Sequence, residues 1–220
     1  RATIRRCRVR WVLADVSGEG VDDDIVARLA DAGGKMRLVL IELAGQRVIR
    51  AAVPLLLSAA DDPDIQVRAA ALTALGKTIG PDHLPVLMER VSKAEDGAEV
   101  SAAVKALGAA SQRMPDVEAC AGQLVAAMTS APDASKCRFL EVLAALGGDR
   151  ALETVAAAAS APQPEMRETA TRMLGEWMTI DAAPVLLDLA KNLPEEKYRV
   201  RALRGYIRLL RQFPLEDDQR

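Results

Sequence analysis

A single histidine limits the catalytic chemistry that this sequence can support. His83 would have to serve in any Ser-His-Asp or Cys-His mechanism, because the 220 residues hold no other histidine. Asp82 precedes it directly, and side chains adjacent in sequence do not orient each other as a catalytic dyad requires. No cysteine stands near His83 at a spacing typical of metal ligands. We therefore expect His83 to lie in a surface turn, and we assign no catalytic and no metal-binding residues.

Other patterns that could bind or cleave a ligand are incomplete. Gly76-Lys77-Thr78 resembles the end of a phosphate-binding loop, but that loop needs a glycine five residues earlier, where this chain has Ala71. The acidic runs at 22–24 and 216–218 are typical of helix-start and tail charges. Nothing in the sequence places two carboxylates across a cleft, as glycosidase chemistry requires. The sequence therefore indicates no cofactor and no small-molecule substrate.

Composition excludes several classes of protein. Hydrophobic residues make up 50% of the chain and the net charge is −2, unlike a disordered protein. No apolar run is long enough to span a membrane, and near-neutral charge with only 3% aromatic residues disfavours a nucleic-acid partner. Three widely spaced cysteines are not a disulfide framework, so Cys7, Cys120 and Cys137 are expected to be buried. The start at Arg1, without a methionine, suggests a segment of a longer protein, and the compartment stays open.

The basic residues are distributed unevenly. Residues 1–10 carry five arginines and residues 197–211 carry six basic residues, and neither stretch contains an acid. Helical spacing in the second stretch places basic side chains on one face and apolar side chains on another. The basic face comprises Lys197, Arg201, Arg204, Arg208 and Arg211, and the apolar stripe comprises Val200, Leu203, Ile207 and Leu210. The basic face is either a solvated surface that meets an acidic neighbouring domain or a binding surface for an anionic partner.

The elements that carry these residues recur along the chain. A Leu-Gly pair, or a looser copy of it, repeats at about 30-residue intervals, which is typical of helical repeat proteins. Its glycines are Gly45, Gly76, Gly108, Gly147 and Gly175. An apolar residue followed by arginine stands shortly before most of them, as in Val67-Arg68 before Gly76. Because the Leu-Gly pair and the preceding arginine keep nearly the same spacing along the chain, they indicate a repeated structural unit.

Each unit is predicted to be a helix, a short turn and a second helix. Apolar positions between Val67 and Gly76 follow helical spacing, and the turn at 61–64 ends in Asp64, a candidate helix cap. Gly80-Pro81 ends that helix, and Pro85 suits the first turn of the next. The predicted helices are 3–16, 22–32, 35–46, 48–60, 65–79, 82–94, 98–112, 116–130, 134–147, 149–160, 164–178, 181–192 and 195–213. In the first of these, apolar residues alternate over 7–13 as in a strand. The helix is favoured because Cys7-Arg8 and 12–14 have the same spacing as Cys137-Arg138 and 142–144.

The stretch 61–76, Asp-Asp-Pro-Asp-Ile-Gln-Val-Arg followed by Leu75-Gly76, resembles a HEAT repeat. It is most similar to the bacterial type that also occurs in phycobilisome lyases, and residues 161–175 are a second match. The resemblance covers about residues 22–213 and implies an all-α fold, a right-handed α-α superhelix of about six helical hairpins. The unit near Ser101 departs from the pattern, since arginine is expected there. On this basis residues 1–220 are predicted to form one solenoid domain, with a capping helix at 1–20 and a tail at 214–220.

The resemblance also implies roles for charged residues. In such repeats the turn aspartate and the arginine that starts the second helix commonly pair within or between units. Here this maps to Asp62 or Asp64 with Arg68, and the same position is occupied by an arginine in other units. The predicted structural ladder comprises Asp64, Arg37, Arg68, Arg138 and Arg167, and Arg201 holds the equivalent position in the last unit.

HEAT arrays mostly bind other macromolecules, so the resemblance implies a non-catalytic scaffold for a protein partner or a neighbouring domain of the same chain. Binding is expected on the concave face or on the basic face at 197–211. Two alternatives remain. A HEAT-fold enzyme of the DNA glycosylase or lyase type would need a deep pocket in which aromatic residues flank an acid, and the candidates are Trp11, Trp177, Tyr198 and Tyr206. The chain could also be a structural spacer within a multidomain bacterial enzyme.

Overall fold

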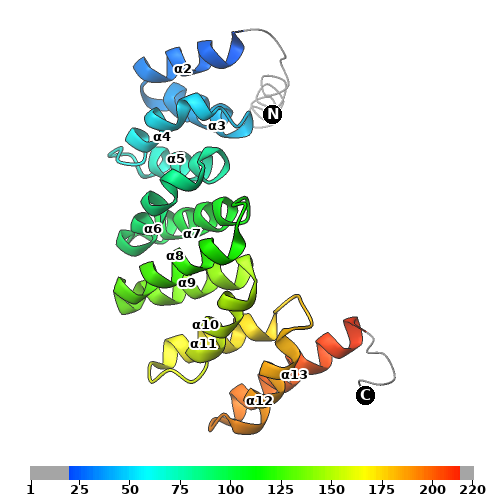
Figure 1. The fold of residues 1–220 in the computed structure, drawn as a ribbon. Helices are drawn as coiled ribbons and strands as arrows, with labels where there is room; N and C mark the ends of the chain where they lie inside the picture. The colour runs from blue at the N-terminus through cyan, green and yellow to red at the C-terminus, as the bar shows by residue number, and fades with distance from the viewer. Residues whose placement is uncertain (1–19, 214–220) are drawn as a thin grey trace, which may run out of the picture. The chain divides into compact units, whose positions relative to one another are not determined.

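The computed structural model describes residues 20–213, and every regular element in that range is a helix (Figure 1). The prediction of an all-α chain of helical hairpins is confirmed for this range. The chain divides into two compact units between Met114 and Pro115. The predicted capping helix and the predicted tail lie outside the described residues, as do Cys7 and Trp11. That all 220 residues form one solenoid domain stays a prediction.

Residues 20–114, the described part of the N-terminal unit, form three helical hairpins. The first pairs α2 (Val21–Asp31) with α3 (Gly34–Gln46). The second pairs α4 (Val53–Ala59), preceded by the 3-10 turn η1 (Arg50–Ala52), with α5 (Ile65–Thr78). The third pairs α6 (Leu84–Lys93), preceded by η2 (Pro81–His83), with α7 (Gly97–Ser111). The second helices α3, α5 and α7 pack in a row in sequence order (Figure 1).

The C-terminal unit repeats this plan. Its hairpins pair α8 (Val117–Ser130) with α9 (Asp133–Leu146), α10 (Asp149–Ala158) with α11 (Pro164–Gly175), and α12 (Ala182–Asn192) with α13 (Glu196–Gln212). The second helices α9, α11 and α13 again pack in sequence order. Each hairpin therefore buries its apolar side chains mainly against its neighbours in the chain, as expected for stacked repeats.

Local chemistry explains where the helices begin. Asp64, Asp96 and Asp116 each accept a hydrogen bond from a backbone N–H of the following first turn, at 2.8 Å. Prolines stand in the first turns of α4, α6 and α11, where a missing N–H costs little. His83 ends the turn η2 and is half-buried. Because these signals are local, the predicted helix starts lie within two residues of the observed ones, with one exception. The helix predicted from residue 48 begins at Val53 as α4, after the 3-10 turn η1.

Two of the repeated glycines allow neighbouring second helices to approach closely. A Cβ atom on Gly45 would lie 2.8 Å from the Cα of Ala74, and one on Gly76 would lie 2.6 Å from the Cα of Ala106. Both distances are too short for a real side chain, so these positions require glycine for the two helices to pack this closely. Gly147 has a different function, because its φ of 75° ends α9 in the left-handed region.

The core consists of side chains that point between the helices. Ile41, Leu72 and Leu75 are fully buried in the N-terminal unit, and Phe139 and Leu143 are fully buried in the C-terminal unit. The predicted burial of cysteines holds for Cys120, whereas Cys137 is only half-buried. None of the described helices is both long enough and apolar enough to cross a bilayer.

Candidate partner-binding surface

Charged pairs join successive hairpins in both units. Arg37 of α3 pairs with Asp62 at 3.1 Å, and Arg68 of α5 pairs with Glu99 at 3.2 Å. In the C-terminal unit, Arg167 of α11 pairs with Glu195 at 3.1 Å. In each case the carboxylate stands near the N-terminal end of the next second helix, where the helix dipole favours a negative charge. We call this series the arginine ladder.

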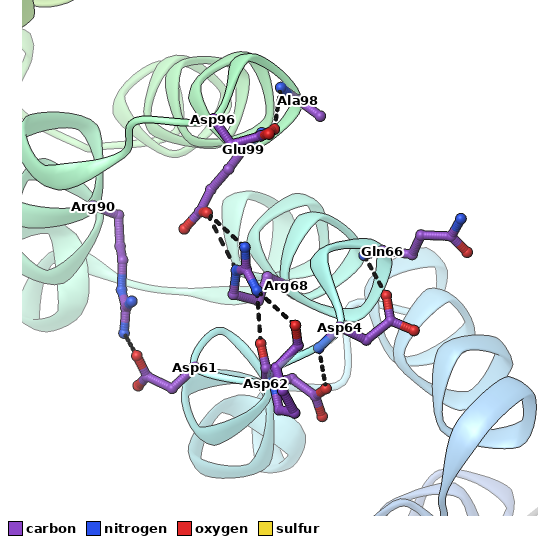
Figure 2. Close-up of polar contacts among 10 residues, drawn as sticks. Asp61, Asp62, Asp64, Gln66, Arg68, Arg90, Asp96, Ala98 and Glu99 are labelled. Carbon is purple, nitrogen blue, oxygen red and sulfur yellow. Dashed lines mark hydrogen bonds and ion pairs between the residues drawn. The ribbon is translucent and has the colours of Figure 1, made fainter.

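Two of the ladder arginines, Arg68 and Arg167, also close the turn of their own hairpin. Figure 2 shows this for Arg68. Its Nη1 donates to the carbonyl oxygens of Asp62 and Pro63, at 3.0 and 3.1 Å. Arg167 repeats the arrangement with the carbonyls of Ala161 and Pro162, at 2.8 and 2.9 Å. Arg68 and Arg167 therefore each contact two successive hairpins.

The ladder differs from the expected pairing in one respect. The carboxylate of Asp64 does not reach Arg68, and instead it accepts a hydrogen bond from the backbone N–H of Gln66 (Figure 2). The carboxylate of Asp62 pairs with Arg37 of the preceding hairpin and accepts a hydrogen bond from the backbone N–H of Asp64. Asp64 therefore serves as the helix cap and Asp62 as the partner of Arg37, and Arg68 pairs instead with Glu99 of α7. Arg138 stands at the corresponding position of α9 and is half-buried.

Each ladder arginine begins a row of side chains that runs along the helix at four-residue steps. The first residue of this row after the arginine is buried in four second helices: Ile41 in α3, Leu72 in α5, Val142 in α9 and Thr171 in α11. In the N-terminal unit the neighbouring hairpin provides this cover, because α3 packs against α5 and α5 packs against α7. The row is therefore the surface on which the next hairpin docks.

None of the described residues covers the same row in α13. Arg199 is the arginine of α13 that contacts its own turn, since its Nη1 donates to the carbonyl of Leu193 at 3.4 Å. Within the described residues, no carboxylate pairs with its guanidinium. The row continues with Leu203 and Ile207, which are 45% and 40% exposed. The expected ladder position, Arg201, is therefore corrected to Arg199.

Three of the five predicted partner-binding residues are engaged within the chain. Lys197 and Arg201 both pair with Glu168 of α11, at 3.2 and 2.6 Å, and Arg201 also donates to the hydroxyl of Thr171 at 2.9 Å. Arg208 donates to the backbone carbonyls of Gly175 and Trp177. These three side chains fasten α13 to α11 and to the turn that follows it.

The electrostatics of this contact agree with its geometry. Hydrogen bonds from Arg201, and then from Lys197, hold the pKa of Glu168 below its usual value. The pKa of Lys197 is raised, first by its interaction with the Tyr198 hydroxyl and then by Glu168. The ammonium of Lys197 also lies 4.4 Å from the centre of the Tyr198 ring. The docking of α13 on α11 therefore favours the ionised form of Glu168, and for Lys197 it adds the second of the two causes.

The other two predicted residues, Arg204 and Arg211, are exposed. With Ile207, Arg208 and Gln212 they line a shallow cavity of about 370 Å³. Val200, which is 39% exposed, continues the apolar surface beside them. The resulting surface combines basic and apolar side chains, and we call it the outer face of α13. It comprises Arg199, Val200, Leu203, Arg204, Ile207 and Arg211.

An apolar stripe on a helix usually packs into the core, but the stripe of α13 does not. Val200, Leu203 and Ile207 are exposed, and Leu210 is half-buried. The side chains that pack into the core come from a different row of α13, namely Tyr198, Ala202, Gly205 and Leu209. Small residues in this row allow a close approach, since a Cβ on Gly205 would lie 3.0 Å from the Cα of Gly175. The sequence contains two candidate apolar rows, and periodicity does not say which one is buried.

Two further cavities occur in the described chain. A groove of about 400 Å³ lies between α3 and α5, where polar residues surround small ones; its polar lining is Glu42, Gln46, Gln66, Thr73 and Lys77. A cavity of about 220 Å³ lies beside the Arg167–Glu195 pair. No aromatic side chain lines any of these three cavities.

The aromatic residues named for the enzyme alternative have structural contacts. Trp177 is buried, and its indole Nε1 donates to the hydroxyl of Thr179 at 2.9 Å. Tyr198 is buried in the core row of α13, and Tyr206 is half-buried. Among residues 20–213, no cluster of three or more His, Cys, Asp or Glu side chains is placed to hold a metal ion.

Comparison with known proteins identifies the repeat. The family model that describes HEAT repeats matches residues 23–108 and 122–205. A complex of CpcE and CpcF of phycocyanin lyase from Nostoc sp. PCC7120 is similar at 21% identity and a TM-score of 0.46, covering 96% of this chain and 84% of that one. Human deoxyhypusine hydroxylase in complex with glycerol is similar at 20% identity and a TM-score of 0.37, covering 91% and 77%. A search of curated proteins found no match.

Proposed function

The chain belongs to the HEAT-repeat family, and from that premise we propose that it is a non-catalytic scaffold that binds a protein partner through the outer face of α13. Stacked helical repeats present extended surfaces on which other proteins bind, and fold alone does not imply an activity. The choice among surfaces has to come from the residues of this chain.

One observation supports the outer face of α13 above the other surfaces. The row that receives a neighbouring hairpin in α3 and α5 is exposed in α13, where Leu203 and Ile207 are uncovered. An exposed apolar row of this kind, bordered by polar residues, is typical of a protein-binding site. Arg204 and Arg211 supply the polar border and are not engaged by acids in the described chain.

The enzyme alternative lacks a comparable observation. It requires aromatic residues beside a carboxylate in a cleft, whereas Trp177 and Tyr198 are buried and line none of the three cavities. The spacer alternative predicts that no surface of this chain captures a partner, so the same experiment separates it from the scaffold.

The test is affinity capture from a lysate of the source organism, followed by cross-linking to locate the contact. We expect Arg204→Glu with Arg211→Glu to reduce partner capture at least about tenfold, because both charges lie on the proposed surface. The matched control is Lys35→Glu with Lys105→Glu, which makes the same change in net charge at exposed sites of the N-terminal unit. Equal partner capture by the wild type, the α13 double variant and the control double variant would contradict the proposal. Cross-links that map away from α13 would contradict it as well.

A further inference from the structure

The residues of the outer face of α13 specify the partner's chemistry as well as its location. Resting on the proposed function, we propose that this face binds an amphipathic helix of a partner protein that carries a carboxylate at its N-terminal end. The helix would lie along the row Arg199, Leu203 and Ile207, where α3 and α5 each receive the second helix of the next hairpin.

The arginine ladder supports the carboxylate and its position. In all three described pairs the acid that meets the ladder arginine comes from the N-terminal end of the neighbouring second helix. Arg199 is held at the same place by the carbonyl of its own turn and has no carboxylate partner in the described chain. A partner helix with an acid in its first turn completes this pair and gains from the helix dipole.

The apolar row sets the distance at which the partner helix lies. Ile207 occupies the position at which α3, α5 and α11 have Gly45, Gly76 and Gly175. Its side chain prevents the backbone contact that Gly76 makes with Ala106. In α9 the same position is Leu146, and α9 still packs against α11. A partner helix on α13 therefore packs through side chains, and its apolar residues at four- and three-residue steps cover Leu203 and Ile207.

Charge excludes one obvious occupant, which is a second copy of this face. Glu196 is the one acid in α13, whereas the helix carries six basic residues. Two outer faces in contact would bring Arg199, Arg204 and Arg211 near their own copies, and like charges oppose association. An acidic partner helix instead places carboxylates beside Arg204 and Arg211 along the edge of the apolar row.

The test uses the whole 220-residue chain and two synthetic peptides, each as long as α13 at 17 residues. The first peptide is amphipathic, with leucines along one face, an aspartate in its first turn and glutamates flanking the leucines. The second has lysine in place of every acid. Fluorescence anisotropy should detect binding of the acidic peptide only, and Ile207→Asp should weaken it at least about tenfold.

Two variants separate specific docking from general effects. Met178→Asp makes the same chemical change at an exposed apolar residue elsewhere in the C-terminal unit, and it should leave the affinity unchanged. Arg199→Glu should weaken binding about tenfold, and a peptide with lysine in place of the first-turn aspartate alone should restore it. Failure of this charge exchange would overturn the assigned orientation of the partner helix.

Other occupants give distinct results. If polyglutamate, which has no leucines, binds as tightly as the acidic peptide, the face is a polyanion site. If the chain alone forms a dimer that Ile207→Asp dissociates, the occupant is a second copy of the chain. Either result overturns the proposal. Absence of peptide binding overturns it as well. If Arg204→Glu with Arg211→Glu still reduces partner capture in that case, the scaffold function stands and only the helical partner is wrong.

Discussion

Helices α5 and α13 present the same row of positions and differ in what covers it. In α5 the row is Arg68, Leu72 and Gly76; its arginine pairs with Glu99, its leucine is fully buried and its glycine touches Ala106. In α13 the row is Arg199, Leu203 and Ile207, and residues 20–213 supply it with no carboxylate, no cover and no close approach. The comparison shows that burial in this fold is decided by the neighbouring hairpin and not by the pattern of the helix itself.

The largest expected effect comes from the middle of the row. Leu72→Ala should lower the free energy of unfolding by about 2–5 kcal/mol, because it opens a cavity at a fully buried site. Leu203→Ala removes the same atoms from an exposed site and should cost within about 0.5 kcal/mol. Urea unfolding followed by circular dichroism measures both, and equal losses would show that Leu203 is covered in solution.

The glycine position should give the next largest effect. Gly76→Ala places a Cβ against the backbone of Ala106 and should destabilise the chain by about 1–3 kcal/mol, despite alanine's better helix propensity. Gly108→Ala is the matched control, since nothing lies within 4 Å of its added Cβ. It should be neutral or stabilising by up to about 1 kcal/mol. A stable Gly76→Ala protein would mean that α5 and α7 can separate at little cost.

Replacing the arginine should also destabilise the chain more in α5 than in α13, but the difference in free energy should be smaller than at the other two positions. Arg68→Ala removes an ion pair and two hydrogen bonds to turn carbonyls, at a side chain that is mostly shielded from solvent. We expect a loss of about 1–3 kcal/mol in thermal or chemical unfolding. Arg199→Ala, which removes a single long hydrogen bond, should cost less than about 1 kcal/mol. Similar losses at both sites would argue that Arg199 already has a partner in the free protein.

The smallest expected effect concerns the side of α13 that is covered. The pKa of Glu168 is lowered by Arg201 and Lys197, so this contact stabilises the fold above the usual pKa of 4.5 and loses its effect as pH falls through the lowered value. The difference in Tm between the wild type and Glu168→Gln should therefore shrink between about pH 6 and about pH 3. Arg204→Gln, on the outer face, is the control that should not change this pH dependence. A constant difference would contradict the assigned contact.

Helix positions followed from the sequence because their signals are local. The predicted helix 65–79 is observed as Ile65–Thr78, and the predicted helix 134–147 as Asp133–Leu146. Asp64 caps α5 and Pro85 stands in the first turn of α6, as their types indicate. Both effects depend on the conformation of one turn, which neighbouring residues fix.

Contacts between hairpins were harder to predict. The sequence contains both Arg199 and Arg201, and only the geometry of the turn at Leu193 shows which one takes the ladder position. Gly147 shares the Leu-Gly pattern with Gly76, yet it ends a helix, whereas Gly76 allows two helices to approach closely. The same residue types serve different roles here, and the role depends on what lies across the interface.

The arginine ladder also bears on how such a chain changes in length over evolution. Each pair joins an arginine of one hairpin to an acid of the next, so the hairpin of α4 and α5, which holds both Asp62 and Arg68, carries an acceptor toward its predecessor and a donor toward its successor. A gene that duplicates or loses a whole hairpin of this kind leaves the neighbouring arginine matched to a neighbouring acid. New repeats can therefore be inserted without inventing a new junction, and Arg199 keeps the joining chemistry available at the surface.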